Sequence, residues 1–307
     1  MPALEIHRSS AGLVSLAAIA LLSGARAEAT PAEARVAALL SEDIAAYREA
    51  LEGFKKIYKG PVIDFDMSQA GDKLGELRAS HPGLVLAVGV HAAKAAAEGF
   101  ADLPVVYCMV LDPAVNGISG SNVTGVTLAI PVKRQFEAFR QLLPALGRLG
   151  VVFSPAKTGS LIEEARSAAA ALGVTLVAES VLRSEQVPDA LARLAGKVDG
   201  LWLPPDATVV TKDTFRLALE LSLARKLPLM VFNSQFVKAG ALFALSPDYG
   251  ASGAEAARIT RLILSGKKPA DIPITPARGT LVINVSTAKN LGLELPASVL
   301  KNAQQVE

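Results

Sequence analysis

Residues 83–110, GLVLAVGVHAAKAAAEGFADLPVVYCMV, decide the fold class of this chain. The unbroken apolar run at residues 84–88 predicts a buried strand, the alanine-rich residues 92–99 predict a helix, and residues 105–111 predict a second strand. A strand, a helix and a strand in this order form a parallel pair with a right-handed crossover. The same alternation predicts further strands at residues 35–40, 62–65, 151–153, 174–178, 201–203, 229–232 and 241–245, and further helices at residues 42–58, 133–143, 161–172, 188–194, 214–225 and 254–264.

The two halves of the chain repeat this unit. Gly83-Leu84-Val85-Leu86 is followed by a helix and then by Leu103-Pro104 at the next strand. In the second half, Gly200-Leu201-Trp202-Leu203 is followed by a helix and then by Leu227-Pro228. This repeat predicts an α/β protein with two lobes, each built on its own sheet. The joint between them is expected near residues 144–150, where one predicted helix ends and a new strand begins.

Composition favours a folded chain with a neutral surface. Apolar residues make up 51% of the 307 residues and charged residues 20%, so a large core is available. The formal net charge is only +2, which gives no reason to expect nucleic acid as a partner. Cys108 is the single cysteine, so an intrachain disulfide is excluded. Its apolar neighbours predict that it is a buried core residue.

The first 27 residues have the pattern of a secretory signal peptide. His7 and Arg8 precede an apolar run at residues 11–22, and Ala25-Arg26-Ala27 fits a cleavage site. The run is too short to span a bilayer. A lipid-anchor cysteine is not found after it. We therefore expect a freely soluble protein of a bacterial periplasm.

Catalytic signatures are missing from the sequence. It has none of the common nucleotide-binding, serine-hydrolase, zinc-protease or C-x-x-C motifs. Beyond the signal segment only His81 and His91 are histidines, and neither has an evident carboxylate or cysteine partner. We expect a binding protein with no catalytic residues, no metal and no cofactor.

Polar residues follow several predicted strands, at the edge where parallel sheets bind ligands. They supply short side chains suited to a small polar solute. Aromatic rings could also stack on a planar ligand, although Trp202 lies within a strand and is expected in the core. The predicted ligand contacts are Ser41, Asp43, Val90, His91, Asp112, Ser154, Thr158, Ser160, Asp206 and Asn233, and the aromatic candidates are Tyr47, Tyr107, Phe153, Phe232 and Tyr249.

Two of these contacts have an assigned chemistry. Ser160 with Glu163 fits a capping box, and the free N–H groups at such a helix start favour a carboxylate. Ser160 therefore caps the helix, contacts a ligand, or does both. Asp206 follows two prolines and could accept an amine or a hydroxyl, or could cap a loop. Asp112 precedes a proline and favours a turn.

Several short segments, in their order along the chain, resemble those of a known family, the substrate-binding proteins of ABC importers. The nearest group within it includes tryptophan- and tyrosine-binding members. Residues 122–125, which belong to one of the segments given next, are also expected to form a turn. The segments are Leu103-Pro104-Val105-Val106, Asp112-Pro113, Asn122-Val123-Thr124-Gly125-Val126, Val151-Val152-Phe153-Ser154-Pro155, residues 199–206, Gly240-Ala241-Leu242, residues 264–273 and residues 283–296.

The resemblance implies the type I periplasmic-binding fold, with two Rossmann-like lobes, parallel sheets and a three-crossover hinge. The first lobe would span residues 28–146 and be completed by about 239–272. The second would span residues 147–238 and be completed by about 273–307. The chain departs from the family at Val90, where threonine is common, and at Ser154, where asparagine is common. Both changes remove polar groups.

The implied function is capture of a small polar molecule, an amino acid or a related carboxylate, between lobes that close by hinge motion. The receptor would be monomeric, would dock on an inner-membrane ABC permease and would bind no nucleic acid. A ligand-sensing receptor for a signalling partner without transport is the main alternative. An exported enzyme is a further one.

Overall fold

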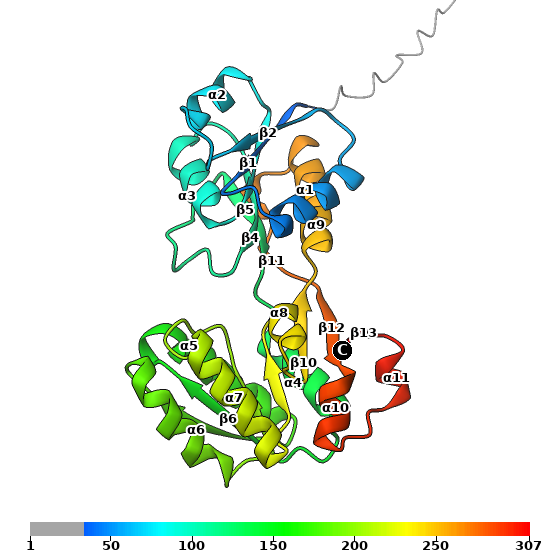
Figure 1. Cartoon of the computed structure of the whole chain (residues 1–307). Coiled ribbons are helices and arrows are strands. Elements are labelled where there is room, and N and C mark those ends of the chain that lie inside the picture. Colours follow the sequence, from blue (N-terminus) through cyan, green and yellow to red (C-terminus); the bar gives the residue numbers. More distant parts are fainter. Residues whose placement is uncertain (1–33) are drawn as a thin grey trace, which may run out of the picture. The chain divides into compact units, whose positions relative to one another are not determined.

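The computed structural model describes residues 34–307, which form two β-sheets flanked by helices (Figure 1). We call each sheet with its helices a lobe. The six strands of the first sheet are all parallel, as the sequence predicts. From edge to edge they are β11 (Thr275–Pro276), β5 (Val123–Thr127), β4 (Val105–Val110), β3 (Leu84–Val88), β1 (Val36–Leu40) and β2 (Val62–Asp66).

The second sheet has seven strands within the described residues. Its neighbouring strands are parallel except for one antiparallel pair. That pair is β10 with β12. From edge to edge the strands are β13 (Gln304–Val306), β12 (Gly279–Asn284), β10 (Phe243–Pro247), β9 (Leu229–Val231), β8 (Gly200–Trp202), β6 (Arg148–Phe153) and β7 (Thr175–Ser180).

The first sheet is covered by helices on both faces, which is why its strands read as continuous apolar runs. In β1, Val36, Ala38 and Leu40 face one helix pair, whereas Ala37 and Leu39 face the other. All five are fully buried. The first helix pair is α1 (Ala45–Ile57) and α9 (Tyr249–Leu264), and the second is α2 (Lys73–Ala79) and α3 (Val90–Gly99).

The second sheet is covered in the same way. Trp202 is fully buried, which confirms that it is a core residue, and its ring meets Phe136 edge-on at 4.9 Å. One face packs against α4 (Val132–Leu142), α5 (Pro155–Ala171), α10 (Val285–Leu291) and α11 (Ala297–Leu300), and the other against α6 (Val187–Ala195), α7 (Lys212–Arg225) and α8 (Ser234–Lys238). The single-turn helices are η1 (Ser184–Gln186) and η2 (Pro269–Asp271).

Three segments of the described chain connect the lobes. Residues 128–131 lead from β5 to α4, Asp248 leads from β10 to α9, and residues 277–278 lead from β11 to β12. The expected lobe boundaries at residues 146 and 239 are therefore corrected to about residues 128 and 248. The expected third boundary, near residue 273, differs by only a few residues.

The helix α4 is the reason for the first of these corrections. Its aromatic face, with Phe136 and Phe139, packs on the second sheet against Trp202 and Phe243. An amphipathic pattern shows that a helix has an apolar face but does not show which sheet that face covers. The break at residues 144–150 separates a helix from a strand within one lobe.

The expected turn at residues 122–125 is also corrected. Asn122 precedes β5, and its side-chain amide donates to the carbonyls of Phe100 and Leu103 at 2.8 Å each. Thr124 lies inside β5, is buried, and donates its hydroxyl to the carbonyl of Ile272 at 2.9 Å. These polar side chains tie the strand to its neighbours.

Cys108 in β4 is fully buried, and burial raises the pKa of its thiol to about 12. This confirms the core assignment, because a thiol that stays protonated is a poor nucleophile. No helix in residues 34–307 is long and apolar enough to cross a membrane. The signal peptide expected at residues 1–27 lies outside the described residues.

The helices α1 and α9 touch backbone to backbone (Figure 1). A Cβ atom placed on Gly53 would lie 2.0 Å from the carbonyl oxygen of Gly250. A Cβ atom on Gly253 would lie 1.7 Å from the carbonyl oxygen of Ala50. Both positions must therefore be glycine for the helices to approach this closely.

Replacing Gly253 by alanine should lower the free energy of unfolding by about 1–3 kcal/mol, the usual range for overpacking a core. Gly99→Ala in the same lobe is the matched control, because its new Cβ would meet only Leu74 at an ordinary distance of 3.8 Å. Urea unfolding followed by far-ultraviolet circular dichroism measures both. Equal stability of the two variants would contradict the close contact.

Candidate functional site

The carboxyl edge of the first sheet brings Ser41 and Gly89 together. They directly follow β1 and β3, which are neighbours with Leu40 opposite Val88. Ser41 is buried, and its Oγ accepts a hydrogen bond from the N–H of Ala92 at 2.9 Å. Ser41 therefore satisfies an amide in the first turn of α3. Its predicted place at this edge is observed, and the structure adds this capping role.

Gly89 is the N-cap of α3 and has a φ of +93°, a conformation that favours glycine. A Cβ atom here would lie 2.6 Å from Ser41 Oγ and 2.7 Å from Cζ of Tyr47. The next two residues, Val90 and His91, begin the helix. In the described structure their N–H groups have no hydrogen-bond partner, as expected for the first turn of a helix.

Two of the other predicted contacts in the first lobe, Asp43 and Asp112, have structural partners. Asp43 is exposed and forms an ion pair with Arg48, which lowers the pKa of the Asp43 carboxyl through a hydrogen bond. Asp112 accepts a hydrogen bond from the N–H of Val115 at 3.1 Å, the turn that its sequence predicts. His91 is exposed. The structure places no cluster of three or more metal-ligating side chains anywhere in residues 34–307.

Asp206 is buried in the second lobe, where only 1% of its surface is exposed, and both oxygens of its carboxylate accept hydrogen bonds. One carboxylate oxygen, Oδ2, accepts from the Ser154 N–H at 2.7 Å and the Thr158 hydroxyl at 2.5 Å. The other, Oδ1, accepts from the N–H groups of Thr208 at 2.9 Å and Val209 at 3.3 Å. Ser154, Thr158 and Asp206 are thus three predicted site residues that the structure brings together.

These four bonds correct the chemistry expected for Asp206. A carboxylate has about four acceptor positions, and the chain's own donors already use four. An amine or hydroxyl of a ligand would have to displace one of them. The carboxylate instead holds the loop after β8 to the first turn of α5. It also places a negative charge at the start of that helix, where an incoming anion would be repelled.

The start of α5 is corrected as well. The helix begins at Pro155 with Ser154 as its N-cap, so Ser160 lies five residues inside it and is exposed. The Ser160 capping box is not formed. The backbone of Thr158 departs from helical geometry, with φ −131° and ψ 15°, which shows a kink after the first turn.

Asn233 caps the short helix α8. Its Oδ1 accepts from the N–H of Gln235 at 3.0 Å and of Phe236 at 3.4 Å. Beside it, the ring of Phe236 lies 4.9 Å from that of Phe232 and 4.6 Å from that of Phe215. Sequence reasoning named Phe232 but missed the cluster, because helix α8 and the start of α7 meet only in the fold.

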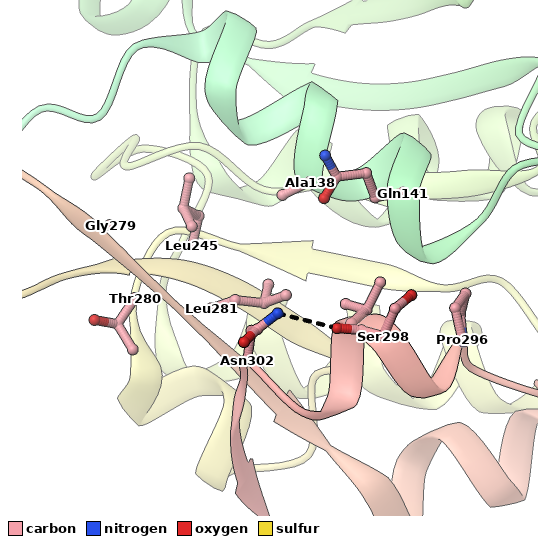
Figure 2. Close-up of a pocket in the computed structure, with 10 residues that line it drawn as sticks. Ala138, Gln141, Leu245, Gly279, Thr280, Leu281, Pro296, Ser298 and Asn302 are labelled. Carbon is pink, nitrogen blue, oxygen red and sulfur yellow. Dashed lines mark hydrogen bonds between the residues drawn. The ribbon is translucent and has the colours of Figure 1, made fainter.

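A separate cavity of about 600 Å³ lies in the second lobe, between α4 and the segment containing α11 (Figure 2). Figure 2 shows Ala138 and Gln141 of α4 on one side and Leu281, Pro296 and Ser298 on the other. The lining of this cavity contains none of the predicted ligand contacts. Its lining carries no charged side chain and comprises Ala138, Gln141, Leu245, Gly279, Thr280, Leu281, Pro296, Ser298, Val299 and Asn302.

Comparison with known proteins adds the family. A family model described as "ABC transporter substrate binding protein" matches residues 52–307. The chain belongs to this family of ABC transporter substrate-binding proteins. The resemblance stated from the sequence is thereby confirmed. Members of the family bind substrates, so this chain is a binding protein and not an enzyme.

A curated relative is the tyrosine-binding protein of Clostridioides difficile (strain R20291), which is 26% identical over 220 residues. The match covers 69% of this chain and 63% of that protein, which is less than two thirds of its length.

Two solved structures share the fold. One is a ligand-free, open substrate-binding protein with adhesive properties from Clostridium difficile. It has a TM-score of 0.77 and 20% identity, over 89% of this chain and 99% of that one. The other is an ABC domain from Streptococcus pneumoniae in complex with L-Trp. It has a TM-score of 0.61 and 24% identity, over 90% and 100%. This chain has the type I periplasmic-binding fold, with two mostly parallel sheets flanked by helices.

Asp206→Ala should lower the free energy of unfolding by at least about 2 kcal/mol, because it leaves buried donors without an acceptor. Urea unfolding can be followed by the fluorescence of Trp202, the chain's only tryptophan, which lies in β8, the strand before the loop that contains Asp206. Asp213→Ala is the control, since the Asp213 side chain is 88% exposed and should change stability by less than about 1 kcal/mol. Equal effects would contradict the structural role of Asp206.

Proposed function

We propose that this protein is the receptor of an ABC importer and captures an aromatic amino acid outside the cytoplasm. The observation that carries the proposal is the start of α3. The N–H groups of Val90 and His91 lie unpartnered at the carboxyl edge of the first sheet. Unpartnered amides at the positive end of a helix dipole are suited to a carboxylate.

At the start of α5 the second lobe offers no comparable place for a ligand carboxylate, which supports the start of α3 as its binding position. The start of α5 already holds the buried carboxylate of Asp206, which accepts from Ser154 and Thr158. A ligand carboxylate brought to the same place would meet that charge in a poorly solvated environment. The carboxylate of the ligand is therefore assigned to the first lobe.

The aromatic character of the ligand is supported by the second lobe and by the relatives. Phe232 follows β9 at the carboxyl edge of the second sheet. Its ring packs against Phe236, which in turn packs against Phe215. Partly buried rings of this kind pack well against another aromatic ring. The curated relative is a tyrosine-binding protein, and a structure of the same fold holds L-Trp. L-tyrosine and L-tryptophan are accordingly the proposed ligands.

Transport by hinge closure completes the proposal. The three connections at residues 128–131, Asp248 and residues 277–278 are short, as a hinge requires. A ligand that contacts both lobes stabilises the closed form by its differential affinity, and the closed form would dock on the permease. Export by the signal peptide would place the monomeric receptor in the periplasm.

Val90→Pro tests the carboxylate contact with little disturbance of the helix. Proline at the first helical position is well tolerated and removes only the N–H. The affinity for L-tyrosine and L-tryptophan, measured by isothermal titration calorimetry, should fall about tenfold or more, as expected for a lost hydrogen bond to a charged group. Val90→Ala keeps the N–H and is the matched control.

Two results would contradict the proposal. Failure of the parent protein to bind either amino acid would exclude this ligand class. Equal affinities of Val90→Pro and Val90→Ala would place the carboxylate elsewhere.

A further inference from the structure

The hydroxyl-bearing end of Tyr47 lies at the start of α3. A Cβ atom on Gly89 would come within 2.7 Å of Cζ and 2.8 Å of Cε2 of this ring. Cζ is the carbon that carries the phenol oxygen, so the polar end of the side chain, and not its stem, covers Gly89. The ring occupies the space that any other residue at position 89 would fill.

The rest of the Tyr47 side chain is held by the first core. The residue lies on α1 and packs against the cluster that contains Leu40, Val88 and Phe54. It is half-buried, and in the described residues its hydroxyl makes no hydrogen bond. Ser41 Oγ, beside it, already accepts the N–H of Ala92. In the described residues the phenol is therefore an available side-chain donor, and so is the Ser41 hydroxyl, whose own proton is not used by that bond.

The phenol also keeps its proton. Burial, and after it the charge of Glu42, raise the pKa of the Tyr47 hydroxyl. At neutral pH it is an uncharged O–H donor. The phenol hydroxyl and the N–H groups of Val90 and His91 can therefore all donate hydrogen bonds to one anion, and none of them brings a positive charge.

We propose that Tyr47 is a ligand-binding residue that selects for a carboxylate, its hydroxyl donating to the same group that the start of α3 binds. The inference rests on the proposed function and adds a specificity-determining residue to it. Gly89 positions the ring, since a side chain there would push the phenol away from Val90.

The experiment compares L-tyrosine with tyramine, which is the same molecule without its carboxylate. Binding of both to the full-length protein and to Tyr47→Phe is measured by calorimetry. The variant keeps the ring and loses only the hydroxyl, so L-tyrosine should bind about tenfold more weakly. Tyramine is expected to bind the parent protein weakly, and the variant should bind it with the same affinity.

Tyr107→Phe is the matched control. Tyr107 is only 1% exposed, which corrects its expected role as an aromatic ligand contact. Its hydroxyl also lacks a hydrogen-bond partner in the structure, and its ring belongs to the core between the first sheet and α3. It should bind L-tyrosine like the parent protein. Unchanged circular dichroism and melting temperature of Tyr47→Phe would show that the variant folds.

The outcomes separate the two proposals. An unchanged affinity of Tyr47→Phe for L-tyrosine would overturn the role of Tyr47 and leave the proposed function standing. An equal loss for L-tyrosine and tyramine would also overturn it, because the hydroxyl would then contact another part of the ligand. If the parent protein bound neither L-tyrosine nor L-tryptophan, the proposed function and this inference would fail together.

Discussion

The contact between α1 and α9 is the constraint on which the chain path depends. The two helices are about two hundred residues apart in sequence, yet Gly53 and Gly253 let their backbones touch. Because α9 completes the first core, the chain must return to the first lobe after building most of the second. It must then leave again, since β12 and β13 extend the second sheet. Three connections between two discontinuous lobes are the direct consequence.

The carboxyl edges of the two sheets differ in how they use their helix starts. At α5 the side chain of the buried Asp206 takes up N–H groups of the chain, and its four hydrogen bonds fix the loop that follows β8. At α3 no carboxylate within residues 34–307 accepts the N–H groups of Val90 and His91, which stay without a hydrogen-bond partner. The same backbone chemistry therefore serves stability in one lobe and is free for a ligand in the other.

The fold class was predictable because it depends on local pattern. Parallel strands covered on both faces are continuous apolar runs, and β1, β3 and β4 stand out for this reason. The position of α4 was not predictable, because its aromatic face could pack on either sheet. The same limit applies to the lobe boundaries.

The candidate site shows the limit more sharply. Strand ends predict which loops share an edge, and Ser41, Ser154 and Asp206 do lie at such edges. The sequence does not show whether a polar group has a partner inside the chain. Ser160 with Glu163 matched a capping box, whereas Pro155 at the true first turn is the stronger start signal. The role of Gly89 depends on its contact with Tyr47 of α1, which lies 42 positions earlier in the chain.

The choice of donors at α3 has a consequence for release. Backbone N–H groups and a neutral phenol bind a carboxylate without an opposite charge, and each contributes less than a bidentate arginine would. Arg48, which follows Tyr47 on α1, is already paired with Asp43 and Asp64. In the proposed importer role this would favour release to a permease, because closure would need only a modest difference in affinity between the open and closed forms. Selectivity for a carboxylate would then depend on how many N–H and O–H donors point at it. The Tyr47 hydroxyl, on a ring held in place by the core, would be one of these donors.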